Sequence, residues 1–161
     1  MPDSQQKELI ESGTPRTSRI ENRLVGRALS HWGKIRGTRK FPSYSDYRRQ
    51  AVPYGEEHIF VINISDSEFS DEIVSAGKKV EEGFGHSPVG RKAIEVIPSS
   101  IENGLSFCRT AAVMKMPIAD IGRFSNANGA EIWYRSILLP LSSDQIRIDH
   151  VLGAFSFKVM E

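Results

Sequence analysis

The last third of the chain alternates three apolar segments with two polar turns. Residues 117–124, 131–141 and 146–159 are rich in β-branched and aromatic side chains. Asn128-Gly129 lies in the first gap, and because both residue types tolerate positive φ, the pair is a strong hairpin signal. The pattern therefore predicts three consecutive antiparallel strands whose apolar face must be covered by another part of the chain.

Two other stretches have helical periodicity. In residues 18–37, apolar side chains recur every three or four positions and form one stripe, which Gly37 ends. A second stripe predicts a helix over residues 99–116, immediately before the first of the three strands. Its apolar positions are Leu105, Cys108, Ala112 and Met116.

Short elements fill the middle of the chain. Residues 58–64 and 69–76 are predicted strands, and residues 77–85 and 89–97 are predicted short helices. We therefore expect an α+β fold with a five-stranded antiparallel sheet, helices on one face and an additional N-terminal helix. The expected division is a mobile polar tail at 1–17, an amphipathic helix at 18–37, an irregular linker at 38–57 and a folded domain at 58–161.

Composition places the chain among ordinary globular proteins. It has 161 residues, of which 25% are charged and 39% are apolar, so one domain with a core of normal size is expected. No apolar run approaches the roughly 20 residues of a membrane span, and residues 1–14 lack a signal-peptide core. These features and the single cysteine, Cys108, favour a cytoplasmic location.

Charge is unevenly distributed along the chain. Residues 16–49 contain ten Lys/Arg and two acids, whereas residues 50–161 contain ten Lys/Arg and fifteen acids. Such asymmetry can indicate contact with nucleic acid or a membrane, although a solvated helix face gives the same pattern.

Sequence motifs for catalysis are largely missing. The chain has no P-loop, no dinucleotide-binding glycine pattern, no H-E-x-x-H and no Cys-x-x-Cys. Its four histidines share no metal-ligand spacing, and Cys108 lies on the apolar side of a predicted helix, where a cysteine usually acts as a small apolar residue. Trp32 and the polar and aromatic residues after it indicate either a clamp that holds the following loop or an exposed partner surface.

The order of elements resembles a PAS (Per-Arnt-Sim) domain. More specifically, the chain is similar to the proteobacterial family of small, stand-alone PAS proteins. The matching motifs are Trp32, Arg36-Gly37, Pro42 and Asp46, then Gly85 and Gly90-Arg91-Lys92, and finally Leu139-Pro140-Leu141 with Val151-Leu152-Gly153. The chain departs from that family at Tyr44, where an Arg is common, and at Arg48-Arg49, where a Pro is common.

The resemblance implies a bacterial, non-enzymatic sensory or regulatory module, with the PAS-like sensory domain over residues 58–161. It implies signal transduction through a small ligand, a partner protein or both. No output domain follows the last strand, so we expect the signal to pass to a separate signalling protein or to a second copy. Flavin photosensors carry an Asn-Cys-Arg-Phe-Leu-Gln-like helix and haem sensors a histidine on the long helix. This chain has neither, so we expect no haem or flavin, while a small organic ligand stays open.

Two sites follow as expectations. The helix at 18–37 is expected to form a homodimer interface, because a lone helix with an exposed apolar stripe would be unstable in water. The helix at 99–116 is expected to enclose a ligand pocket against the sheet, with a fully packed core as the alternative. The interface residues are Ile20, Leu24, Val25, Ala28 and Trp32, and the pocket residues are Phe84, Ile97, Leu105, Cys108, Ala112, Ile121 and Tyr134.

Two further functions stay open. A small α+β enzyme with a cone-shaped fold could use the same pocket for chemistry, and Asp120 and Glu131 are the nearest acid–base candidates. A nucleic-acid binder with a basic arm would use residues 16–49 instead, and its binding would depend steeply on salt. We expect neither a nucleic acid nor a metal ion to be the physiological ligand.

Overall fold

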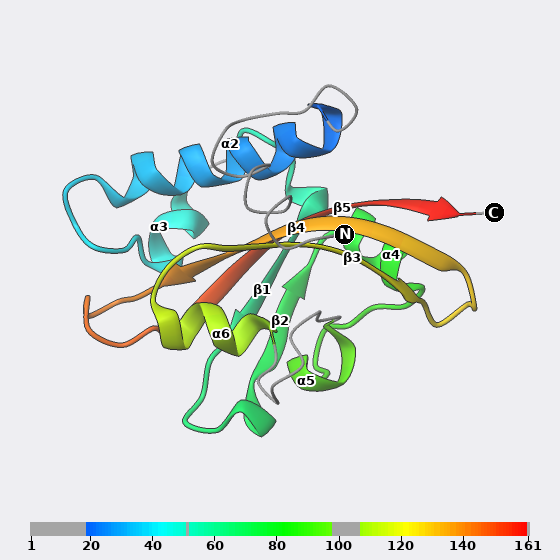
Figure 1. Ribbon diagram of the computed structural model, residues 1–161. Coiled ribbons are helices and arrows are strands. Elements are labelled where there is room, and N and C mark those ends of the chain that lie inside the picture. Colours follow the sequence, from blue (N-terminus) through cyan, green and yellow to red (C-terminus); the bar gives the residue numbers. More distant parts are fainter. Residues whose placement is uncertain (1–18, 51, 98–106, 161) are drawn as a thin grey trace.

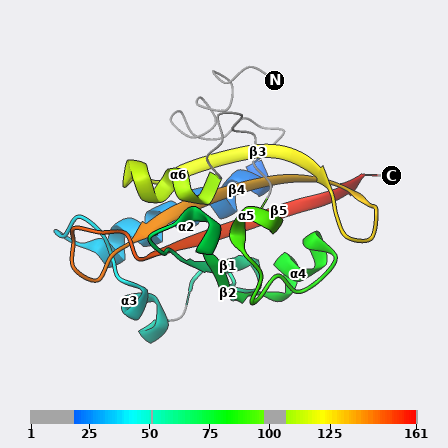
Figure 2. The ribbon, with the colours of Figure 1, turned by 90° about the horizontal axis from the view of Figure 1, so that it is seen from below.

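A computed structural model describes residues 19–50, 52–97 and 107–160, in which a single sheet lies between two layers of helices (Figure 1). Figures 1 and 2 show α2 and α3 on one side of the sheet, which we call the outer face, and α4, α5 and α6 on the other, which we call the inner face. The helices are α2 (Arg19–Arg36), α3 (Tyr44–Arg49), α4 (Lys78–Phe84), α5 (Ala93–Val96) and α6 (Phe107–Met114).

The five strands pair in the order β2-β1-β5-β4-β3, and every neighbouring pair is antiparallel. This arrangement confirms the predicted fold class, including helices on one face and an additional N-terminal helix. The strands are β1 (Ile59–Asn63), β2 (Glu72–Ala76), β3 (Ile118–Ser125), β4 (Glu131–Leu141) and β5 (His150–Met160).

The Asn128-Gly129 turn sets the register of β3 against β4. Gly129 has φ 80°, a conformation that favours glycine, and the Asn126 side chain accepts hydrogen bonds from the N–H groups of Asn128 and Ala130. The turn closes the pair Ser125 and Glu131, and every later pair in the two strands follows from it.

Strand β4 is buried on both faces along half of its length. Residues 136–141 are all buried because Ser136 and Leu138 face the inner helices while Ile137, Leu139 and Leu141 lie under α2. A strand that is covered on both sides has a nearly continuous apolar sequence. This explains why Ile137 to Leu141 contains no polar residue.

The apolar stripe of α2 packs on the sheet of its own chain. Leu24, Val25, Ala28 and Trp32 are at most 9% exposed, and the Trp32 indole donates a 2.9 Å hydrogen bond to the Pro140 carbonyl. The premise of the predicted dimer interface, an exposed stripe, is therefore corrected: these four side chains belong to the core. Ile20 lies in α2, but its side chain is outside the described set.

The segment expected to be an irregular linker contains the helix α3. Ser43 caps it, accepting from the Asp46 N–H at 3.1 Å, and the Asp46 carboxylate accepts in return from the Ser43 N–H at 2.9 Å. This is a capping box with Asp in place of the usual Glu or Gln, which is why the sequence pattern was missed. The expected tail at residues 1–17 lies outside the described residues.

Candidate ligand and partner sites

Two of the predicted pocket residues meet on the inner face, in a cluster of aromatic rings. Phe84 from α4 lies edge-on to Phe155 with ring centroids 5.3 Å apart, and Tyr134 stacks on Phe155 at 5.9 Å. Phe124 contacts both Phe84 and Tyr134 at 5.8 Å. These rings fill the space between α4 and the sheet, so the described residues at this end form packed core.

The other predicted pocket residues that the structure describes do not join this ring cluster. Ala112 lies in α6, beside a hollow that also touches Ile64 and Ile148, and Ile97 follows α5 and is half-buried. Ile121 pairs with Arg135, one position away from Tyr134, so its side chain faces the outer side of the sheet. Leu105 lies outside the described residues. Cys108 is in α6, but its side chain is not described.

A buried polar pair sits beside the aromatic cluster. The Tyr134 hydroxyl donates a 2.6 Å hydrogen bond to the Asp120 carboxylate, and both residues are at most 5% exposed. Burial, and then the nearby Asp120 charge, raises the pKa of Tyr134. A Cβ on Gly122 would lie 2.8 Å from the Tyr134 hydroxyl, so a glycine is needed there for the phenol to cross β3 and reach Asp120.

The acid–base candidates do not come together. Asp120 pairs with Ser136 within the sheet, whereas Glu131 is exposed at the hairpin and accepts a 2.6 Å hydrogen bond from the Trp133 indole. Sequence reasoning missed the partnership of Asp120 with Tyr134. The Asn-Gly turn could have revealed it, because counting back from that turn places Gly122 opposite Tyr134.

A buried ion pair fixes α6 to the connection between β1 and β2. Arg109 donates to Asp71 at 2.9 Å, and it also donates to the Ser65 carbonyl at 3.0 Å. Asp71 is fully buried and accepts from the Ser65 N–H at 2.8 Å. Since a buried charge needs such partners, we assign this group a structural role.

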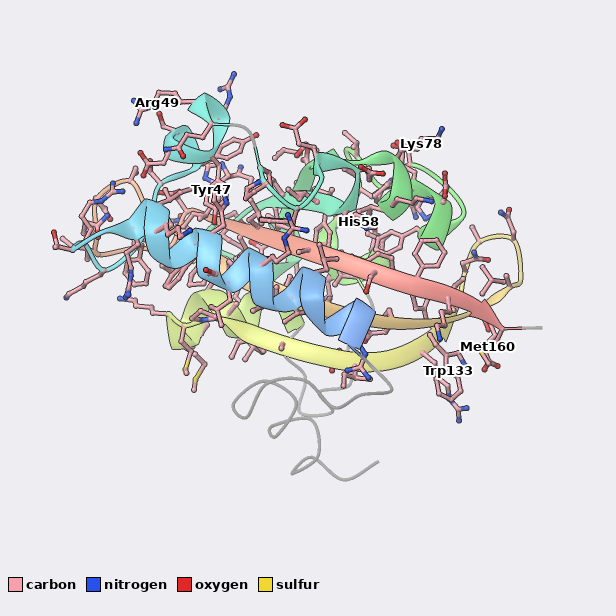
Figure 3. All side chains as sticks on the ribbon, turned by 90° about the horizontal axis from the view of Figure 1, so that it is seen from above. Tyr47, Arg49, His58, Lys78, Trp133 and Met160 are labelled. Carbon is pink, nitrogen blue, oxygen red and sulfur yellow. The ribbon has the colours of Figure 1, made fainter. Side chains whose placement is uncertain are left out.

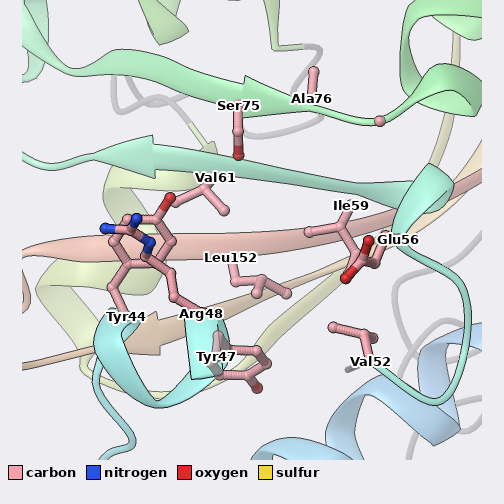
Figure 4. Close-up of a pocket in the computed structure, with 11 residues that line it drawn as sticks. Tyr44, Tyr47, Arg48, Val52, Glu56, Ile59, Val61, Ser75, Ala76 and Leu152 are labelled. Atoms are coloured by element: carbon pink, nitrogen blue, oxygen red, sulfur yellow. The ribbon is translucent and has the colours of Figure 1, made fainter. Parts of the chain in front are cut away.

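The outer face is hollowed where α2 no longer covers it. A hollow of about 270 Å³ lies there, and Figure 4 shows Ile59, Val61 and Leu152 on its floor. Tyr44 and Arg48 stand at one end and Glu56 at the other. Ser75 from the edge strand β2 completes the wall. The hollow therefore combines an apolar floor with two opposite charges.

A larger, polar hollow of about 860 Å³ adjoins the first, and Tyr44 and Arg48 line both. Arg39 and Arg49 also line it, and each pairs with Asp46, at 2.9 and 2.8 Å. The Ser43 backbone N–H and then Arg39 hold the pKa of Asp46 below its usual value, against the effect of burial.

The residues after Trp32 divide into a clamp and a surface. The Gln145 side chain accepts from the N–H groups of Lys40 and Phe41 at 3.0 Å and donates to the Phe41 carbonyl at 2.9 Å. Together with the Trp32 hydrogen bond, this fixes the loop to the β4–β5 connection. Arg48 and Arg49 remain exposed, and Figure 3 shows the Arg49 side chain at the surface, on α3.

Three buried polar groups lie behind the apolar hollow, between α2 and α3. His31 contacts Tyr47 and Tyr54 edge-on, with ring centroids 5.4 and 5.8 Å apart. Within the described structure, His31 Nδ1 and both tyrosine hydroxyls have no hydrogen-bond partner. Burial, and then Lys34, lowers the pKa of His31. Burial raises the pKa values of both tyrosines.

The part of the chain that the structure describes lacks both a metal-binding cluster and a membrane-spanning helix. It contains no cluster of three or more His, Cys, Asp or Glu side chains able to hold a metal ion. None of its helices is long and apolar enough to cross a membrane.

Comparison with known proteins identifies the fold. Neither a protein-family model nor a curated protein matches this sequence. A PAS domain from Colwellia psychrerythraea is 19% identical, with a TM-score of 0.51 over 68% of this chain and 92% of that one. The light state of the blue-light photoreceptor Aureochrome1 LOV is 17% identical, with a TM-score of 0.52 over 66% of this chain and 84% of that one. The protein therefore has a PAS-type fold.

A light-oxygen-voltage domain studied with a flavin analogue is also similar, at 12% identity and a TM-score of 0.51 over 64% of this chain and 78% of that one. This likeness concerns the fold alone. In this chain the ring cluster fills the inner face under α4, and the Phe60 ring covers Gly153, where a Cβ would lie 2.2 Å from it. These ring contacts pack the described inner face under α4 with the chain's own side chains.

Proposed function

We propose that this protein is a non-enzymatic regulatory module that acts by binding a partner protein through its outer face. The observation that carries the proposal is a local contrast: under α4, rings fill the described inner face, whereas beside α3 the outer face has two adjoining hollows. Exposed hollows with mixed apolar and charged linings are typical of transient protein contacts.

Photo-crosslinking in cells of the source organism tests this function. A benzophenone amino acid replaces Arg48, at the hollows, or Arg123, at the far end of the sheet near Trp133 (Figure 3). We expect a discrete crosslinked protein from position 48 but not from position 123, and the purified partner should rebind the wild-type chain. Identical products from both positions, or none from position 48, would contradict the proposal.

Small-molecule sensing is a second candidate, favoured by the buried Tyr134–Asp120 pair, which lies beside the aromatic cluster of the inner face. Ligand pockets are mostly apolar with a few well-placed polar groups. Native mass spectrometry of the purified protein should then show a bound organic molecule that Tyr134→Phe loses. The same measurement gives the mass of the assembly and so tests the predicted homodimer. Absence of any adduct would leave partner binding as the function.

A further inference from the structure

The two hollows of the outer face meet at one residue pair. The guanidinium carbon of Arg48 lies 5.9 Å from the centroid of the Tyr44 ring, and both residues line both hollows. The apolar floor lies on one side of this pair and the arginine-lined hollow on the other. A single extended segment could therefore occupy both.

Charge around the pair is strongly positive. Residues 24–50 contain seven Lys/Arg and one acid, Asp46, which Arg39 and Arg49 already share. Arg48 is exposed and forms no ion pair with any residue in the described ranges. Asp149, the carboxylate that lines the polar hollow, accepts a hydrogen bond from the Ser143 hydroxyl and lies 2.8 Å from His150 Nδ1. A carboxylate of a partner could therefore form an ion pair with Arg48 without displacing an acidic residue of the described ranges.

Glu56 makes the two ends of the apolar hollow differ in charge. It lies at the end of the apolar hollow opposite Arg48 (Figure 4) and makes no ion pair within the described residues. An acidic group would be repelled at that end and attracted at the Arg48 end. The floor between them, with Ile59, Val61 and Leu152, suits one bulky apolar side chain.

We infer that α3 and the edge of β2 form a docking groove for a partner segment of defined polarity. The segment carries acidic residues that contact Arg48 and the polar hollow. It places one bulky apolar residue in the adjoining apolar hollow and a neutral or basic residue toward Glu56. The inference rests on the proposed function, because it specifies the chemistry of the partner at the same face.

Chemical-shift mapping of the ¹⁵N-labelled full chain tests the inference with a defined probe. The probe is the peptide Glu-Glu-Asp-Leu-Gly-Lys, capped at both ends, together with its reversed sequence, and each is added to about 1 mM so that weak binding is detected. We expect shifts concentrated in residues 44–49 and 75–77 with at least one of the two peptides. Replacing the Leu of the probe by Ser, or its acids by Lys, should abolish them.

Matched variants assign the effect to the groove. Arg48→Glu should weaken peptide binding about tenfold, because it replaces an attraction by a repulsion. Ser75→Phe should block the apolar hollow and give a similar loss. Arg123→Glu is the control, because Arg123 is also exposed and stacks on a ring, that of Trp133 at 5.6 Å, but lies far from the groove.

Three results would overturn the inference: scattered shifts or none with both peptides, equal binding of the Lys probe, or binding that survives Arg48→Glu. Displacement of the peptide by single-stranded RNA at lower concentration would also overturn it, and would make this surface a nucleic-acid site. A partner crosslinked at position 48 that binds without an acidic segment would refute only the inference. Failure to crosslink any partner would refute the proposed function itself.

Discussion

The two ends of the outer face differ in how they are closed, although they belong to the same sheet. Under α2, the strands β4 and β5 are sealed by Leu24, Ala28 and Trp32, and Leu139 and Leu141 are fully buried. Beside α3, Ile59 and Val61 border a hollow instead. The difference shows that the longer helix α2, with a regular apolar stripe, closes the core, whereas the short helix α3 leaves part of the sheet accessible.

The sealed end should be the most sensitive to polar substitution. In the double variant Leu24→Asp, Ala28→Asp, two unpaired carboxylates would enter the core, and we expect a loss of at least about 4 kcal/mol in the free energy of unfolding. Chemical denaturation measures it, and Ser30→Asp on the exposed side of α2 is the control. If the wild type is a dimer and the double variant is a folded monomer, the stripe on α2 would instead be a subunit interface.

The same contrast applies to neighbouring positions of α6. Ala111 is fully buried, whereas Ala112 borders a hollow of about 360 Å³. Ala111→Phe should overpack the core and cost about 1–3 kcal/mol, while Ala112→Phe should be tolerated at less than about 1 kcal/mol. Thermal unfolding of both variants checks this. Equal losses would mean that the hollow beside Ala112 closes in solution.

Removing one tyrosine hydroxyl from each face of the sheet compares how much each hydroxyl contributes to stability. Tyr134→Phe removes the donor to the buried Asp120 and should cost about 1–3 kcal/mol. Tyr47→Phe removes a buried hydroxyl without a partner in the described structure, so it should be neutral or stabilising. Denaturant titration of both proteins provides the measurement. Destabilisation by Tyr47→Phe would indicate that an ordered water satisfies that hydroxyl.

The smallest expected effect is a pH dependence from His31. Because its folded pKa is lowered by burial and by Lys34, the unfolded chain binds the proton more readily. The stability contribution is therefore complete above the ordinary pKa of 6.5 and is lost as pH falls from there through the folded pKa. Melting temperatures across this range should decline less in His31→Phe than in the wild type. Parallel curves would contradict the assignment.

The sequence by itself determined the elements that local rules control. Alternating apolar runs and the Asn128-Gly129 turn defined β3, β4 and β5, because a strand period and a positive-φ turn can be recognised without knowledge of the rest of the chain. The stripe on α2 was also evident. The sequence did not reveal which surface packs on this stripe, because the same stripe suits a second copy of the chain or the chain's own sheet.

Only the tertiary structure decided which side chains meet. Asp120 and Tyr134 come together through strand register, and Ile121, one residue away from Asp120, faces the opposite side of the sheet. Arg48 and Glu56 border one hollow because α3 and the short segment before β1 lie over the same part of the sheet. Such contacts depend on register and on how separate elements pack, and residue spacing along a single chain does not contain that information.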